Sequence, residues 1–319
     1  MSNERQGLSI TRLKELVRER SKRAELPLAE RRALMDANAE TFPVPAGVTV
    51  SVADIDGMRA EWARASDSRD APVVLYFHGG GYVNGSSVSH RHLTSRLALA
   101  AAANVLSVDY RLAPEHPFPA AVDDGLKAWH WLLARGHAPE AMAMAGDSAG
   151  GGLVAATLLA ARRDGLPMPA GAALLSPWSD LTCDTETYVS CAEADPMITQ
   201  AGIKEMAAIY LAGADPRDPL ASPNFGDLAG LPPLLIQVGS DEVLLDDARD
   251  LERRARAAGV EAELEVWDGM IHVWQAFYQM LPEGERAIER VGGWLAARWL
   301  AGGAAKGSLA ACNAALNNG

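Results

Sequence analysis

Residues 146–150 of the chain read Gly-Asp-Ser-Ala-Gly, and this stretch decides the fold that we predict. It follows a short apolar run at 141–145 and opens a helix-like run at 151–159. A serine between two glycines, in a strand–turn–helix context, is the pattern of a nucleophile elbow, which holds the serine hydroxyl exposed at the tip of a tight turn. Glycine suits the flanking positions because a side chain there would collide with the neighbouring backbone. The stretch therefore predicts Ser148 as a nucleophile.

The composition bounds the class of protein. The chain has 319 residues, of which 49% are hydrophobic and 22% are charged, and this is enough for a sizeable core in one or two domains. Its formal net charge of −12 argues against nucleic acid or an anionic membrane surface as a partner, because both require a basic face. No apolar run reaches the ~18 residues of a membrane span, so we expect no membrane insertion.

The cellular setting follows from the N-terminus and the cysteines. Residues 1–23 are polar and densely charged, unlike a secretory signal, and we expect a cytoplasmic protein. The three cysteines, Cys183, Cys191 and Cys312, form an odd set without metal-ligand spacing. We interpret all three as free thiols.

Strands and helices alternate along most of the chain. Period-2 patterns at 48–55 and 58–65 predict an antiparallel strand pair joined by Asp56-Gly57. Buried strands are then expected at 73–77, 104–110, 141–145, 172–176, 234–239 and 261–267, with helices at 90–102, 119–135, 151–164, 244–258 and 281–299. This order predicts an α/β fold with a mostly parallel sheet that is flanked by helices on both faces.

Three segments stand outside this alternation. Residues 1–45 are predicted to form a helical arm, and 180–224 an insertion with a helix at 198–212 that begins after Thr199. An insertion of this length must have structure of its own, and it emerges where ligands bind in open α/β sheets. We expect the arm and the insertion to form a cap over a core of 46–179 and 225–300. The segment 301–319 has no pattern, and we expect it to be disordered or an engineered remnant.

A serine nucleophile needs a base and an acid. In an elbow fold the chain order is Ser, acid, His, and of the seven histidines only His272 follows Ser148. It lies in a loop directly after the strand at 261–267. Asp241 directly follows the strand at 234–239 and is therefore the predicted acid, with Glu242 as the fallback.

Residues 78–81 read His-Gly-Gly-Gly and follow the strand at 73–77. Consecutive glycines leave backbone N–H groups uncovered, so that a substrate carbonyl can approach them, as in the donor loop of esterases. The N–H of Ala149, at the start of the helix after the elbow, is a further donor. A phosphate cradle is the alternative for a glycine run, but no Gly-Lys-Ser/Thr follows. The loop therefore predicts an oxyanion hole, with His78 in a structural role.

These motifs together resemble the bacterial hormone-sensitive lipase family of esterases. The resemblance covers about residues 40–300 and rests on six segments: His-Gly-Gly-Gly at 78–81, Asp-Tyr-Arg-Leu-Ala-Pro-Glu at 109–115, Gly-Asp-Ser-Ala-Gly at 146–150, Ser-Pro-Trp-Ser-Asp-Leu at 176–181, Gly-Ser-Asp-Glu-Val-Leu-Leu-Asp at 239–246 and Trp-Asp-Gly-Met-Ile-His-Val-Trp at 267–274. One departure is Glu242, which follows Asp241 where the family often has proline; we expect no consequence for the triad.

The resemblance implies an α/β-hydrolase fold and carboxylesterase activity, mostly on esters of short acyl chains. It implies a triad of Ser148, Asp241 and His272. It also implies oxyanion donors at Gly80, Gly81 and Ala149, a cap of the kind predicted above and, frequently, a homodimer. Arg111 and Glu115 are expected to fix their loop.

The chemistry expected of these residues is two-step acyl transfer, which needs neither a metal nor an organic cofactor. Positions suggest five residues as walls of a substrate pocket, although each could equally be ordinary core: Tyr82, Trp178, Met197, Tyr210 and Trp274. A cap favours small soluble esters over lipid surfaces.

Two alternatives remain open. A lactonase or a deacetylase would use the same triad. A non-catalytic small-molecule receptor is of a different class; plant gibberellin receptors resemble this family but lack the catalytic histidine, so His272 argues against this reading.

Overall fold

A mixed eight-stranded sheet forms the centre of the protein. The structure, a computed structural model, describes residues 8–21, 26–66, 68 and 71–301. Strand order across the sheet is β1-β2-β4-β3-β5-β6-β7-β8; β1 and β2 pair antiparallel, β2 pairs antiparallel with β4, and all the remaining pairs are parallel. The strands are β1 (Thr49–Ile55), β2 (Met58–Arg64), β3 (Val73–Phe77), β4 (Asn104–Val108), β5 (Met142–Asp147), β6 (Gly171–Leu175), β7 (Leu234–Gly239) and β8 (Ala262–Trp267).

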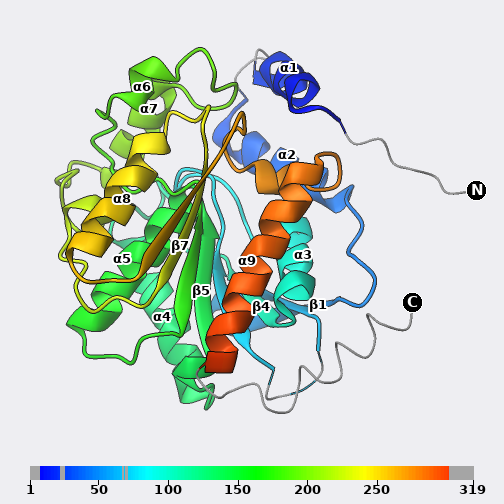
Figure 1. Ribbon diagram of the computed structural model, residues 1–319, viewed down its shortest axis with the longest axis vertical. Coiled ribbons are helices and arrows are strands. Elements are labelled where there is room, and N and C mark those ends of the chain that lie inside the picture. Colours follow the sequence, from blue (N-terminus) through cyan, green and yellow to red (C-terminus); the bar gives the residue numbers. More distant parts are fainter. Residues whose placement is uncertain (1–7, 22–25, 67, 69–70, 302–319) are drawn as a thin grey trace, which may run out of the picture.

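Helices cover both faces of this sheet (Figure 1). Side chains alternate along β3, so that Leu75 belongs to the core cluster that includes α4, α5 and α8, while Tyr76 belongs to the cluster that includes α3 and α9. The helices are α1 (Ile10–Ser21), α2 (Leu28–Glu40), α3 (Arg91–Ala101), α4 (Ala120–Ala134), α5 (Ala149–Arg163), α6 (Thr187–Ser190), α7 (Gln200–Leu211), α8 (Leu245–Ala257) and α9 (Pro282–Ala301), with short 3₁₀ turns η1 (Pro139–Ala141), η2 (Pro223–Phe225) and η3 (Trp274–Phe277). The predicted three-layer α/β architecture is confirmed.

The arm and the insertion lie at the same end of the molecule (Figure 1). The arm contains α1 and α2, and the 180–224 insertion contains α6 and α7, whose N-cap Thr199 accepts a hydrogen bond from the Gly202 N–H at 3.1 Å. Arg18 on α1 donates to the Glu193 carbonyl at 3.0 Å, so the arm contacts the insertion. Of the predicted tail, 302–319 lie outside the described residues.

No helix in the described part of the chain is long and apolar enough to cross a membrane.

Candidate active site

The turn between β5 and α5 has the strained geometry expected of a nucleophile elbow. Ser148 has φ 54° and ψ −123°, a backbone conformation that residues other than glycine rarely adopt. A Cβ at Gly146 would lie 2.5 Å from the Gly150 carbonyl oxygen, and one at Gly150 would lie 2.0 Å from the Phe77 carbonyl oxygen. Glycine is therefore required on both sides of the serine, and the turn has the backbone geometry of an elbow.

His272 lies against the serine hydroxyl. The distance from its Nε2 to the Ser148 Oγ is 2.9 Å, although the two residues are separated by 124 positions in the chain. Its Nδ1 lies 2.9 Å from the Glu242 Oε2. A carboxylate only accepts, so Nδ1 carries a proton and donates it, which leaves Nε2 free to accept the serine proton.

The prediction that Asp241 orients His272 is wrong. The structure brings Glu242 to the ring, fully buried, where its Oε1 also accepts from the Gly239 N–H at 2.6 Å and the Ser176 hydroxyl at 2.7 Å. Asp241 points outward instead and pairs with Lys14 of α1. The departure at 242 from the family pattern thus has a consequence, because the fallback acid is the one in contact with the histidine.

Burial and charge act in opposite directions on His272. Burial favours the neutral ring and would lower its pKa, but the hydrogen bond to Glu242 and the charge of that carboxylate outweigh burial and raise the pKa above the ordinary value. The imidazolium that forms when the ring takes a proton is therefore stabilised by Glu242.

Three backbone donors lie beside the elbow. Within the described residues, the N–H groups of Gly80, Gly81 and Ala149 have no hydrogen-bond partner. Gly80 and Gly81 have φ of 120° and 65°, conformations that favour glycine, and a Cβ at Gly80 would lie 2.3 Å from the Asn84 carbonyl oxygen. The Gly79 N–H, in contrast, is used within the protein, since it donates to Asp147 at 3.0 Å. This arrangement can accept a negatively charged oxygen next to Ser148.

A cavity of about 380 Å³ opens onto the serine. Ser148, His272, Gly80 and Gly81 lie in its lining. Much of the remaining wall is apolar and comes from the arm, the loop after β6, the insertion and the segment after β8: Met35, Trp178, Met197, Ile198, Ile203, Met206, Val273, Ala276 and Phe277. The described residues hold no group of three or more His, Cys, Asp or Glu side chains that could bind a metal.

Known proteins similar to this chain identify its family. A family profile described as the alpha/beta hydrolase fold matches residues 74–276. The chain belongs to the α/β-hydrolase fold family.

Within that family the chain lies among the esterases of the bacterial hormone-sensitive lipase family. A crystal structure of an esterase from that family is 47% identical, with a TM-score of 0.88 over 91% of this chain and 98% of that one. An esterase/lipase from an uncultured bacterium is 50% identical, with a TM-score of 0.87 and the same coverage. A protein of Streptomyces hygroscopicus named acetyl-hydrolase is 49% identical over 83% of this chain and 88% of its own length.

The hydrolase cavity uses only some of the predicted wall residues. Trp178 and Met197 line it, as predicted. Tyr82 and Tyr210 do not; their rings stack 3.9 Å apart in the core cluster. Trp274 is fully buried in a separate cluster that includes Leu13 of α1.

Sequence reasoning missed several wall residues on the two helices that reach the cavity. Ile203 and Met206 lie on the apolar face of α7, and Met35 lies on the half-buried side of α2. Their helical spacing could have identified them, because an amphipathic helix over an open sheet edge must bury its apolar face.

The loop-fixing predictions agree with the contacts. Arg111 pairs with Asp124 at 2.9 Å, and Glu115 receives two hydrogen bonds of 2.9 Å from Arg32 of α2. Nδ1 of His78 lies 2.8 Å from the Gly79 carbonyl oxygen, in line with a structural role in the glycine loop.

Proposed function

We propose that this hydrolase is a carboxylesterase that acts on short- to medium-chain acyl esters through an acyl-enzyme. The observation that carries the proposal is the unbroken chain of contacts from Ser148 Oγ through both nitrogens of His272 to Glu242, beside three unpaired backbone donors. We assign Ser148 as nucleophile, His272 as base and Glu242 as the acid that orients the base.

The first half-reaction forms the acyl-enzyme. His272 takes the proton of Ser148 as its Oγ attacks the ester carbonyl carbon. The carbonyl oxygen becomes an oxyanion, which the N–H groups of Gly80, Gly81 and Ala149 stabilise. The C–O bond then breaks, and the alcohol leaves with the proton that His272 returns to it.

The second half-reaction releases the acid. Water gives a proton to His272 and attacks the acyl carbon, a second oxyanion forms against the same donors, and the bond to the Ser148 Oγ breaks as that oxygen regains its proton. Every step uses residues of this chain alone.

We further propose that the arm and the 180–224 insertion form the cap of the cavity. Met35 of α2 and Met206 of α7 both line the cavity, which supports the assignment of the two segments to one cap. The Asp195 carboxylate ties the insertion to the acid loop, since it accepts from the Met197 and Val243 N–H groups at 2.8 and 3.1 Å. A cavity near the lower end of the ~300–1,000 Å³ found for ligand sites favours small esters.

Acetyl esters are the substrates that we place first. The relative named acetyl-hydrolase, at 49% identity, supports this choice. A lactonase or a deacetylase would use the same three residues. The receptor alternative is disfavoured by the 2.9 Å contact between His272 and Ser148, because a receptor has no need of an activated serine.

For the cellular location and the oligomeric state we keep the expectations from the sequence. We propose a cytoplasmic enzyme, in line with the free thiols of Cys183 and Cys191. A homodimer is also proposed; β8 lies at the edge of the sheet, and Val266 on it is exposed. Light scattering of the purified protein measures the oligomeric state.

Turnover of p-nitrophenyl acetate, butyrate and decanoate tests the activity, with Ser148→Ala as the control. We expect turnover to be fastest with the two shorter esters and absent in the variant. A folded wild-type protein that turns over none of the three would contradict the proposal.

A further inference from the structure

Asp147, the residue before the nucleophile, joins the elbow to the donor loop. Its Oδ1 accepts from the Gly79 N–H at 3.0 Å and from the Tyr76 hydroxyl at 2.7 Å. Its Oδ2 lies 3.3 Å from the Nε2 of His90. Because Gly79 precedes the donors Gly80 and Gly81, the place of this carboxylate helps to set where those donors lie relative to the serine.

The hydrogen bonds around His90 favour a doubly protonated ring. The Ser89 hydroxyl donates its single proton to the Ser86 carbonyl at 2.9 Å and accepts from the Ser86 N–H at 2.8 Å. It can therefore only accept at the His90 Nδ1, 2.8 Å away. Nε2 faces a carboxylate, so it too must donate.

Electrostatics agree with this assignment. Burial alone would lower the pKa of His90, but the charge of Asp147 and the hydrogen bond to it raise the pKa above the ordinary value. The neighbouring ring of His78, 5.5 Å away between centroids, is neutral: burial and the charge of His90 lower its pKa to about 4. A buried pair of His90 and Asp147 thus stands beside the elbow.

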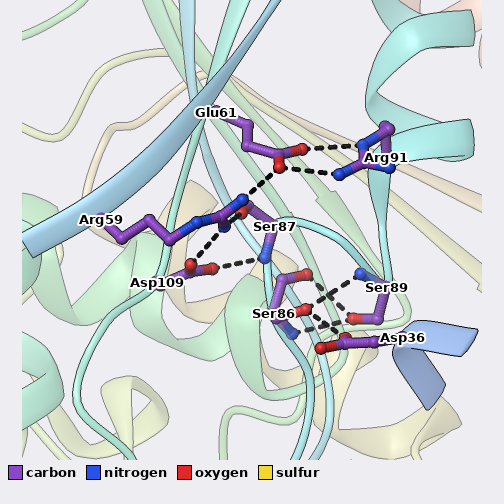
Figure 2. A network of polar contacts seen from close by, with 8 residues as sticks. All are labelled: Asp36, Arg59, Glu61, Ser86, Ser87, Ser89, Arg91 and Asp109. Atoms are coloured by element: carbon purple, nitrogen blue, oxygen red, sulfur yellow. Dashed lines mark hydrogen bonds and ion pairs between the residues drawn. The ribbon is translucent and has the colours of Figure 1, made fainter. Parts of the chain in front are cut away.

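The loop at 86–89, which directly precedes His90, contacts the arm through Asp36 (Figure 2). The Ser86 hydroxyl donates to the Asp36 carboxylate of α2 at 2.5 Å and accepts from the Ser89 N–H at 3.0 Å. On the sheet side, Ser87 is held by Arg59 and Asp109, at 2.6 Å to its hydroxyl and 2.5 Å to its N–H. The loop is therefore fixed by the core at Ser87 and by the arm at Ser86.

We propose that His90 is a positioning residue, which holds the donor loop against the elbow through Asp147. Asp36 couples the position of the donor loop to the packing of α2 on the core. The inference rests on the proposed function, since it concerns the donors of the oxyanion hole. His90 also lines the cavity, but both of its nitrogens are engaged within the protein. It therefore acts through Asp147 and not on the substrate.

Two substitutions at the arm test the coupling without opening the core. Asp36→Ala removes the acceptor for the Ser86 hydroxyl, and Asp36→Asn keeps an acceptor oxygen. Arg31→Ala, on the exposed side of the same helix, is the matched control. His90→Gln tests the buried pair directly. The kcat of each protein is measured per active site, with sites counted by titration with an organophosphate.

The deciding readout is the inhibition constant of a trifluoromethyl ketone, whose adduct with serine places an oxyanion on the donors. For Asp36→Ala we expect kcat to fall about tenfold at unchanged KM, and the inhibition constant to rise by a similar factor; loss of a whole donor costs ~100- to 1,000-fold. We expect a larger effect in His90→Gln, near wild-type values in Arg31→Ala, and partial recovery in Asp36→Asn.

Folded Asp36→Ala and His90→Gln with kcat and inhibition constant both unchanged would overturn the proposal. So would a lower kcat with an unchanged inhibition constant, because that is the result of a merely structural role. If His90→Gln does not fold, the comparison of Asp36→Ala with Asp36→Asn still tests the proposal. A wild-type protein without any esterase activity would refute the proposed function, whereas an active wild type with unaffected variants refutes only the positioning role.

Discussion

Replacing each of the two neighbouring acids, Asp241 and Glu242, by its amide in a separate variant distinguishes their roles. Glu242→Gln keeps the shape of the side chain but replaces one acceptor oxygen by an NH₂ donor. Three donors converge on the carboxylate, from Gly239, Ser176 and His272, so the amide must present its NH₂ to a donor. The structure thus predicts that His272 loses either its protonated Nδ1 or its orientation.

The expected magnitude follows from the role of the acid. Replacing the acid of a serine triad by its amide lowers kcat about 10⁴-fold through the wrong histidine tautomer. We expect a loss of about 10³- to 10⁴-fold in Glu242→Gln, which corresponds to about 4–5.5 kcal/mol of transition-state stabilisation. Asp241→Asn loses only a partly exposed ion pair with Lys14, worth about 0–1 kcal/mol of stability, and its kcat should stay within about threefold of wild type.

Initial rates with p-nitrophenyl acetate, measured per folded enzyme at saturating substrate, provide the comparison. Circular dichroism and the thermal midpoint show that each variant is folded. The reasoning is refuted if Asp241→Asn loses the activity while Glu242→Gln retains it, since that would make Asp241 the acid.

Three further outcomes follow from the same geometry. His272 must be neutral to act as base and its pKa is raised, so kcat/KM should fall as pH drops through a value above the ordinary ~6.5, and the residual activity of Glu242→Gln should show this fall at lower pH; a pH–rate profile with no fall above pH 5 contradicts the assignment. Gly80→Ala would place a Cβ 2.3 Å from the Asn84 carbonyl oxygen and should lower kcat at least ~100-fold, whereas unchanged turnover would show that Gly80 is no donor. Ile203→Trp fills part of the cavity and should reduce kcat/KM for p-nitrophenyl butyrate more than for acetate, and an equal effect on both esters would place Ile203 away from the acyl chain.

The elements were predictable from sequence because their signals are periodic. The buried strand β3 is a continuous apolar run and β7 is one but for Gln237, and the structure gives both strands the predicted bounds. The elbow was predictable for another reason, because its glycines are demanded by backbone contacts that any such turn must make.

The acid was not predictable because a turn has no period. Gly239 ends β7, and the chain then reverses through Ser240 and Asp241 before α8 begins at Leu245. Which of two adjacent carboxylates faces inward depends on the dihedral angles of that turn and on the loop that packs over it. Here the Asp241 N–H donates to the Met270 carbonyl at 3.2 Å, which leaves the longer Glu242 side chain directed at His272.

The prediction of Trp274 as a wall residue of the cavity was wrong for a related reason. Trp274 lies two residues after His272, and sequence proximity suggested a shared pocket. The 3₁₀ turn η3 instead carries its ring toward Leu13 and Ile271. The partners that decide this come from α1 and the loop before His272, and no local pattern shows that they meet.

The central claim is that Ser148 carries the acyl group. Rapid mixing with p-nitrophenyl acetate and acid quenching, followed by mass spectrometry of the peptides, measures this directly. We predict a burst of p-nitrophenol and an acetyl group on the peptide that contains Ser148, with neither in Ser148→Ala. An acetyl group found on another residue, with full turnover by Ser148→Ala, would contradict the account.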